Sequence, residues 1–312
     1  MMRYLSLPII LSLTFAGTAC SAQETPVKER AVETVLAAAA VSETSLYPDN
    51  AWRDVDPENL MVIDTDYGQI HIELYPEIAP KHVAQVKTLT RQKFYDYITF
   101  HRVIDDFMNQ TGDPKGDGTG DSKLPDIEAE FEFRRSPEMS LTIVNERPIN
   151  PRNPSAGSIG VGFYKALAVA SQPASAAILT KDGKVRAFGL HCKGVTSMAR
   201  SNDPNSANSQ FFLMRGTADH LNAGYSIWGN TVYGHENLTK IKKGTVGETS
   251  GFIPDKMNKV QIAADIPEAD RINIQVLDTD SSAFKNYLRT QKKSDGSYPD
   301  ICDISVPSRL KP

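Results

Sequence analysis

The 312-residue sequence predicts a mainly β fold, either a barrel or a sandwich, with few helices. Apolar, β-branched and aromatic residues come in many short runs rather than in long segments with helical spacing. Turn-forming residues separate several of these runs, as expected between paired strands. The runs lie at residues 61–63, 94–103, 185–190, 211–214, 226–232, 260–263 and 272–277. Many short strands with few helices favour closed or two-layered β architectures.

Composition and charge restrict the class of protein. Hydrophobic residues make up 40% and charged residues 23% of the chain, as in soluble globular proteins. The formal net charge is −4 without an excess of Lys and Arg, so we expect no nucleic-acid partner. The six His residues lie scattered without the spacing of metal ligands, and we therefore expect no metal site.

Residues 1–22 have the features of a secretory signal. Arg3 precedes a mostly apolar stretch from Tyr4 to Ala16, and small residues follow as far as Cys20. The apolar stretch is shorter than the ~18–20 residues that a permanent membrane anchor needs. We therefore expect an exported protein that functions in a bacterial periplasm.

Two cleavage sites are open for this signal. Cys20 follows Ala-Gly-Thr-Ala, which resembles a bacterial lipoprotein site, and Cys20 would then become the lipidated first residue. Gly17 departs from that pattern, because such sites usually carry Leu or another larger apolar residue there. Ordinary cleavage near Ala22 is the alternative. A lipid on Cys20 would be the only expected contact with a membrane.

Residues 23–57 are predicted to form a spacer between the signal and the folded domain. Helix propensity supports one helix over residues 27–41, which include an Ala run at 37–40. The apolar face of this helix is thin, which is why we interpret the segment as a spacer rather than as part of a core.

A hairpin and a helix are predicted at the start of the domain. The apolar run at 61–63 precedes a turn at 66–69, and apolar and polar residues then alternate over 70–74. A helix follows from Pro80, a favoured first helical residue, with apolar residues at helical spacing as far as Leu89.

Three later segments carry a resemblance to a known family. They read FHRVIDDFMNQTGDP at 100–114, SMARSNDPNSANSQFF at 197–212 and DHLNAGYSIWG at 219–229. The first two closely resemble the signature blocks of the cyclophilins, a family of peptidyl-prolyl cis–trans isomerases, and the third matches the loop and strand that follow. The resemblance covers about residues 60–246.

The resemblance implies a fold and a domain layout. We expect a closed, cyclophilin-like antiparallel β-barrel of about eight strands with capping helices. It would occupy residues 58–280 and be interrupted by an insertion at about 136–190, with a C-terminal extension at 281–312. We expect the insertion to lie outside the barrel, beside the substrate groove. The family works without a metal or a cofactor.

The chemistry of X-Pro isomerisation explains what such a site needs. Twisting the bond loses amide resonance, which sets a barrier of roughly 18–20 kcal/mol. In the twisted state the imide nitrogen regains a lone pair and can accept a hydrogen bond. An apolar pocket for the proline ring and a donor aimed at that nitrogen therefore lower the barrier without any nucleophile.

The resemblance assigns these roles to particular residues. Arg102 would supply the donor, and Gln110 is the second expected catalytic residue, because it can fix Arg102 and substrate carbonyls. At Arg200 the backbone would pair with the peptide, so its side chain should matter little. The expected substrate-binding residues are Phe107, Met108, Ala199, Arg200, Gln210, Phe212, His220, Leu221 and Tyr225. Taken singly, the apolar ones are more simply core residues; their joint arrangement favours the functional interpretation.

The sequence departs from the usual family pattern at four places. His220 stands where many members carry Trp, which puts tight binding of cyclosporin-like ligands in doubt, and Tyr225 stands where many carry His. Thr111 replaces a usual Gly, and Asp105-Asp106 a usual Pro-Gly, which could alter the loop under the pocket.

We expect a monomeric isomerase that acts on proline-containing polypeptides among exported proteins. A binding module or chaperone with little turnover is the alternative function. Arg102 favours the enzyme, because a pure binder needs the pocket but not the donor.

The three Cys residues indicate a disulfide. Cys20 is lipidated or removed, which leaves Cys192 and Cys302 as a pair in a compartment where disulfides persist. Cys302 lies in the C-terminal extension, within residues 299–306, which are predicted to form a short strand. Two buried free thiols are the alternative. The bond requires Cα atoms within about 7 Å of each other.

Overall fold

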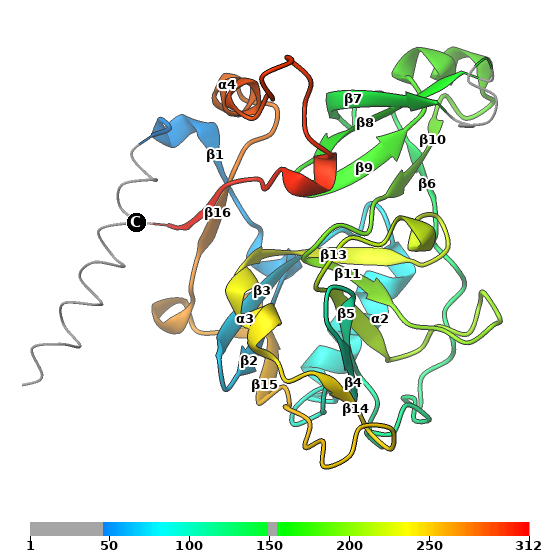
Figure 1. Ribbon diagram of the computed structural model, residues 1–312, viewed down its shortest axis with the longest axis vertical. Helices are drawn as coiled ribbons and strands as arrows, with labels where there is room; N and C mark the ends of the chain where they lie inside the picture. Colours follow the sequence, from blue (N-terminus) through cyan, green and yellow to red (C-terminus); the bar gives the residue numbers. More distant parts are fainter. Residues whose placement is uncertain (1–45, 149–154, 156, 312) are drawn as a thin grey trace, which may run out of the picture. The chain divides into compact units, whose positions relative to one another are not determined.

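The computed structural model describes residues 46–148, 155 and 157–311 (Figure 1). Everything below belongs to the compact unit Tyr47–Pro312. The predicted signal at 1–22, the lipidation candidate Cys20 and the predicted helix at 27–41 lie outside the described residues. In the part that is described, no helix is both long and apolar enough to cross a membrane.

The main element is a nine-stranded sheet in which every neighbouring pair is antiparallel. Its strands, in spatial order, are β14 (Gly244–Thr245), β4 (Arg102–Ile104), β5 (Met108–Thr111), β12 (Phe211–Met214), β11 (Val195–Met198), β13 (Ile227–Tyr233), β3 (Gly68–Leu74), β2 (Leu60–Thr65) and β15 (Lys259–Ile262). The sheet is strongly curled (Figure 1). The prediction of a mainly β fold with few helices is confirmed.

The expected closed barrel of about eight strands is confirmed only in part. The sheet is a curled half-barrel with nine strands, and its edge strands β14 and β15 do not pair with each other. Irregular backbone occupies the gap: Tyr97 N–H donates to Met257 O at 2.7 Å, and Phe100 N–H donates to Asp255 O at 2.8 Å. A single isolated bridge, Thr99 to Lys256, forms there, so the ladder does not continue around the sheet.

The predicted hairpin and helix are both present. β2 and β3 pair with Ile63 opposite Ile70, and the turn between them needs a left-handed residue, which Gly68 supplies at φ +113°. Helix α2, Pro80–Arg91, begins at the expected proline. Its residues Val83, Val86 and Leu89 are buried against the sheet, as their spacing predicts.

The segment predicted to be an insertion forms most of a second sheet. Its order is β6 (Phe133–Arg135), β10 (Val185–Gly189), β9 (Leu167–Ser171), β8 (Ser158–Tyr164) and β7 (Thr142–Pro148). This sheet is separate from the nine-stranded one, but it is not peripheral to the core. Val161, Phe163 and Leu167 belong to the same apolar cluster as Met108 and Phe212.

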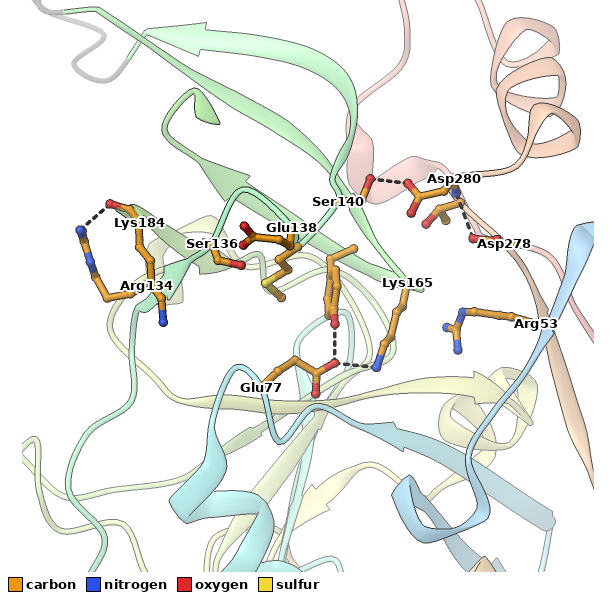
Figure 2. A pocket seen from close by; sticks show the side chains of 13 residues that line it. Arg53, Glu77, Arg134, Ser136, Glu138, Ser140, Lys165, Lys184, Asp278 and Asp280 are labelled. Atoms are coloured by element: carbon orange, nitrogen blue, oxygen red, sulfur yellow. Dashed lines mark hydrogen bonds and ion pairs between the residues drawn. The ribbon is translucent and has the colours of Figure 1, made fainter. Parts of the chain in front are cut away.

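A cleft of about 560 Å³ runs between this second sheet and the loop that follows β3 (Figure 2). Among the lining residues, Glu77 accepts hydrogen bonds from Tyr164 Oη at 2.6 Å and from Lys165 Nζ at 2.5 Å. These bonds join the end of β8 and the turn after it to the loop that follows β3, which further ties the insertion to the rest of the unit.

A third sheet joins the first and the last strand of the described residues. β1 (Trp52–Asp54) and β17 (Ser308–Leu310) pair with opposite edges of β16 (Ile274–Leu277). The first strand falls within residues predicted to be spacer, and the last within the predicted C-terminal extension. The extension also contains α4 (Ser282–Thr290), whose Phe284 and Leu288 are buried. The short strand predicted at 299–306 is wrong: residues Ile301–Asp303 form a 3₁₀ turn that Asp300 caps.

Replacing Phe163 by Ala tests whether the insertion and the extension fold with the rest. Phe163 is buried in β8 and meets Phe284 of α4 edge to face at 5.6 Å. Phe163→Ala should lower the free energy of unfolding by about 3 kcal/mol through lost burial and an unfilled cavity. Ile178→Ala is the control, because Ile178 is 88% exposed. A single cooperative urea transition with an unshifted midpoint in Phe163→Ala would contradict this view.

Candidate active site

Strand register places three of the predicted site residues in one row. Arg102 of β4 lies opposite Gln110 of β5, and Gln110 lies opposite Phe212 of β12. Directly opposed residues share one face of a sheet, so the three side chains project to the same side. Phe211, the neighbour of Phe212, packs in a different cluster on the other face, as alternation predicts.

Hydrogen bonds hold the Arg102 side chain from one side. Its Nη1 donates to Gln110 Oε1 at 3.2 Å, and Gln110 Nε2 donates to Gln210 Oε1 at 3.1 Å. Gln210 Nε2 in turn donates to the carbonyls of Gly118 and Gly120, at 3.1 and 2.8 Å. Arg102 Nε and Nη2 have no hydrogen-bond partner among the described residues. Arg102 is half-buried, and these donors remain available to a ligand.

Apolar side chains gather beside the guanidinium. Met108, Phe212 and Leu221 are buried in one cluster, with Phe107 packed against it. Met108 Sδ lies 3.9 Å from Arg102 Nη1. His220 is exposed and stacks on Phe107, with ring centroids 5.9 Å apart and planes inclined by 26°. The arrangement therefore offers an apolar surface next to a cation.

The other predicted binding residues lie at the far end of this surface. Ala199 N–H donates to Gln210 O at 2.9 Å, and Tyr225 packs edge to face on Phe212 at 5.7 Å. The Arg200 guanidinium lies 4.5 Å from the Tyr225 ring centroid and donates to Gly224 O through Nε and Nη2. The structure thus brings all eleven predicted catalytic and binding residues into one region.

The departures from the family pattern each have a local partner. Thr111 is buried, and its hydroxyl donates to Thr99 O at 2.9 Å. In the turn between β4 and β5, Asp105 pairs with Lys243 and with the buried Arg215, whose Nη2 lies 3.2 Å away. Asp106 takes a left-handed conformation at φ 53°. This turn places Phe107, which follows it.

Two residues near the site were not found by sequence reasoning. The side chain of Arg215 is only 2% exposed, and it donates to Asn109 Oδ1 and to the carbonyls of Leu238, Thr239 and Ile241. His191 is 1% exposed and stacks on Phe212, with centroids 6.2 Å apart. Burial lowers the pKa of His191 to about 4, so the ring is neutral near pH 7. Neither residue stands in a pattern that a sequence alone would single out.

The two Cys residues lie next to each other. The Sγ atoms of Cys192 and Cys302 are 1.95 Å apart and their Cα atoms 4.9 Å apart, well within the limit of about 7 Å for a disulfide.

Among residues 46–148, 155 and 157–311, no group of three His, Cys, Asp or Glu side chains is placed to hold a metal ion.

Comparison with known proteins agrees with this geometry. Residues 60–263 match the model of the family "Cyclophilin type peptidyl-prolyl cis-trans isomerase/CLD". A "Probable peptidyl-prolyl cis-trans isomerase" of Brucella suis is 34% identical over 246 residues, which cover 75% of this chain and 97% of that protein. The crystal structure of cyclophilin AquaCyp293 from Hirschia baltica superposes with a TM-score of 0.73 at 34% identity, and covers 85% of this chain and 97% of its own.

The fold and the matched residues define the class of protein as an isomerase of X-Pro peptide bonds. The chain belongs to the cyclophilin-type peptidyl-prolyl cis–trans isomerase family and is an enzyme of that family.

Proposed function

We propose that this protein accelerates X-Pro isomerisation in exported proteins of a bacterial periplasm, by non-covalent stabilisation of the twisted bond. One observation carries the mechanism: Arg102, Gln110 and Phe212 stand in one row, with donors of Arg102 unused beside an apolar surface. A cation with a planar fork of donors is suited to a lone pair that develops only in the twisted state.

The side chains divide the work between holding and catalysis. Phe107, Met108, Phe212 and Leu221 form the proline-binding surface, which buries the pyrrolidine ring. Gln110 holds Arg102 Nη1 at 3.2 Å, so that the remaining donors point to the imide nitrogen without reorganisation. The peptide on either side of the proline runs past Tyr225, Ala199 and Arg200.

The cellular setting is part of this proposal. Residues 1–22 direct export, with either a lipid on Cys20 or cleavage near Ala22. In an oxidising compartment Cys192 and Cys302 form a disulfide. The mature protein acts as a monomer on proline-containing polypeptides and uses no cofactor.

An isomerisation assay on the mature chain tests the function. The chain from residue 23 should accelerate cis–trans exchange of a short X-Pro peptide, measured by NMR exchange or by a coupled protease assay. Slow uncatalysed exchange, over tens to hundreds of seconds, makes acceleration easy to detect. Binding of the same peptide without acceleration would instead support the chaperone function.

A further inference from the structure

We infer that His191 is a positioning residue: it supports the ring of Phe212 from behind and so shapes the proline-binding surface. The inference rests on the proposed function, because it concerns the same site. His191 lies in the loop before β11 and does not reach Arg102 in the row of catalytic residues. It acts through Phe212.

Three aromatic rings pack against one another at this point. The His191 and Phe212 rings are nearly parallel, inclined by 21° with centroids 6.2 Å apart. Tyr225 meets both edge to face, at 6.4 Å from His191 and 5.7 Å from Phe212. These separations are those of favourable aromatic pairs. Phe212 is therefore held between side chains that do not belong to its own strand.

Hydrogen bonds fix the imidazole itself. His191 Nδ1 lies 3.1 Å from Asn222 Oδ1, and Nε2 lies 3.2 Å from Ser197 Oγ. The amide of Asn222 is oriented in turn, because its Oδ1 accepts from the backbone N–H of His191 at 2.8 Å and its Nδ2 donates to Asp219 at 3.1 Å. Both ring nitrogens are thus engaged, although the ring is buried.

Counting protons assigns the direction of these bonds. Asn222 Oδ1 only accepts, so Nδ1 carries the proton of the neutral ring and Nε2 is an acceptor. The Ser197 hydroxyl has one proton and two acceptors within reach, the Ser226 carbonyl at 2.9 Å, to which it donates, and His191 Nε2 at 3.2 Å. The tautomer protonated at Nδ1 fits both contacts, and the ring cannot turn without losing its hydrogen bond to Asn222.

The residues that hold His191 lie next to Phe212. Ser197 of β11 lies directly opposite Phe212 of β12, so the serine that bonds the imidazole belongs to the neighbouring strand. Asn222 follows the 3₁₀ turn Asp219–Leu221, whose Leu221 lies in the same apolar cluster as Phe212. His191 therefore connects two parts of the proline-binding surface, the β12 strand and the loop that carries Leu221.

Replacing the imidazole by an aliphatic side chain should leave the Phe212 ring less well fixed in the surface that holds the proline ring. That surface binds the planar and the twisted states alike, and loss of uniform binding raises KM while kcat stays unchanged. For His191→Leu we expect a KM about tenfold higher, the size of a lost aromatic pair. His191→Phe keeps a flat ring and should restore part of the loss.

His71→Leu is the matched control. His71 is also fully buried, burial also lowers its pKa to about 4, and it also packs edge to face on an aromatic ring, that of Tyr233 at 5.6 Å. Its ring nitrogens have no hydrogen-bond partner within the described part of the chain. KM and kcat of His71→Leu should equal those of the wild type.

Steady-state kinetics on one X-Pro peptide separates the outcomes. An unchanged KM in His191→Leu, with or without a lower kcat, would overturn the inference. The proposed function would still stand in that case, provided that the wild type is active. An inactive wild type would instead refute the proposed function. Should His191→Leu not fold, Asn222→Ala, which removes an anchor of the ring, decides in its place: a raised KM supports the inference, and an unchanged KM overturns it.

Discussion

Replacing Arg102 by Ala is expected to lower kcat/KM for an X-Pro peptide about a hundred- to thousandfold, with most of the loss in kcat. Within the described residues, the Arg102 side chain bonds only Gln110 and Met108, and it is half-buried. The stability of the folded state therefore depends little on this side chain. The interaction that disappears is one that forms in the twisted state. Circular dichroism and the midpoint of urea unfolding should change little.

Two further variants sharpen this test. Arg102→Lys keeps the charge but loses the planar fork, and it should recover only a small part of the activity. Arg91→Ala is the control for loss of an arginine: its guanidinium pairs with Glu58 and Asp265 at the exposed face of α2, where such pairs contribute little. Near-full activity of Arg102→Ala would show that another group stabilises the twisted bond.

Local patterns in the sequence predicted the elements whose contacts lie close together along the chain. The β2–β3 hairpin follows from alternation and a turn, and α2 from helical spacing after Pro80. The row of Arg102, Gln110 and Phe212 was located by resemblance, and the register of β4, β5 and β12 then explains why these residues meet.

Long-range packing was beyond what the sequence could show. β1 pairs with β16, so Trp52 lies opposite Leu277 across more than two hundred residues of chain. The insertion was expected to lie outside the barrel, beside the substrate groove, and the sequence did not show that its Phe163 meets Phe284 of the extension. The open edge of the main sheet depends on irregular backbone at 97–100, which carries no strand pattern of its own.

Buried polar residues escaped prediction for a related reason. The two terminal nitrogens of Arg215 donate to carbonyls from the segment 238–241 and to Asp105, which come from different parts of the chain. The ring nitrogens of His191 contact Ser197 and Asn222. A polar side chain is stable in a core only when it has hydrogen-bond partners. Those partners come together only in the folded chain, so the sequence does not reveal them.

Loss of the proposed Cys192–Cys302 disulfide should lower the free energy of unfolding by about 4–5 kcal/mol. The bond would close a loop with a sequence separation of 110 residues, and restricting the unfolded chain over such a length has an effect of that size. For a chain of this length the melting temperature should fall by roughly 10 °C. The loop joins the segment before β11 to the 3₁₀ turn at Ile301–Asp303.

The experiment compares the mature chain from residue 23, which holds only these two Cys residues, with Cys192→Ala/Cys302→Ala. Urea unfolding of the wild type should shift strongly when dithiothreitol is added, whereas the double variant should unfold at the lower midpoint with or without reductant. The reduced wild type and the variant should agree, because Cys192 is buried and Ala leaves only a small cavity there. Native-state burial of free thiols is the competing explanation. Labelling of both thiols in unfolded protein purified from an oxidising compartment without reductant would establish it and exclude the disulfide.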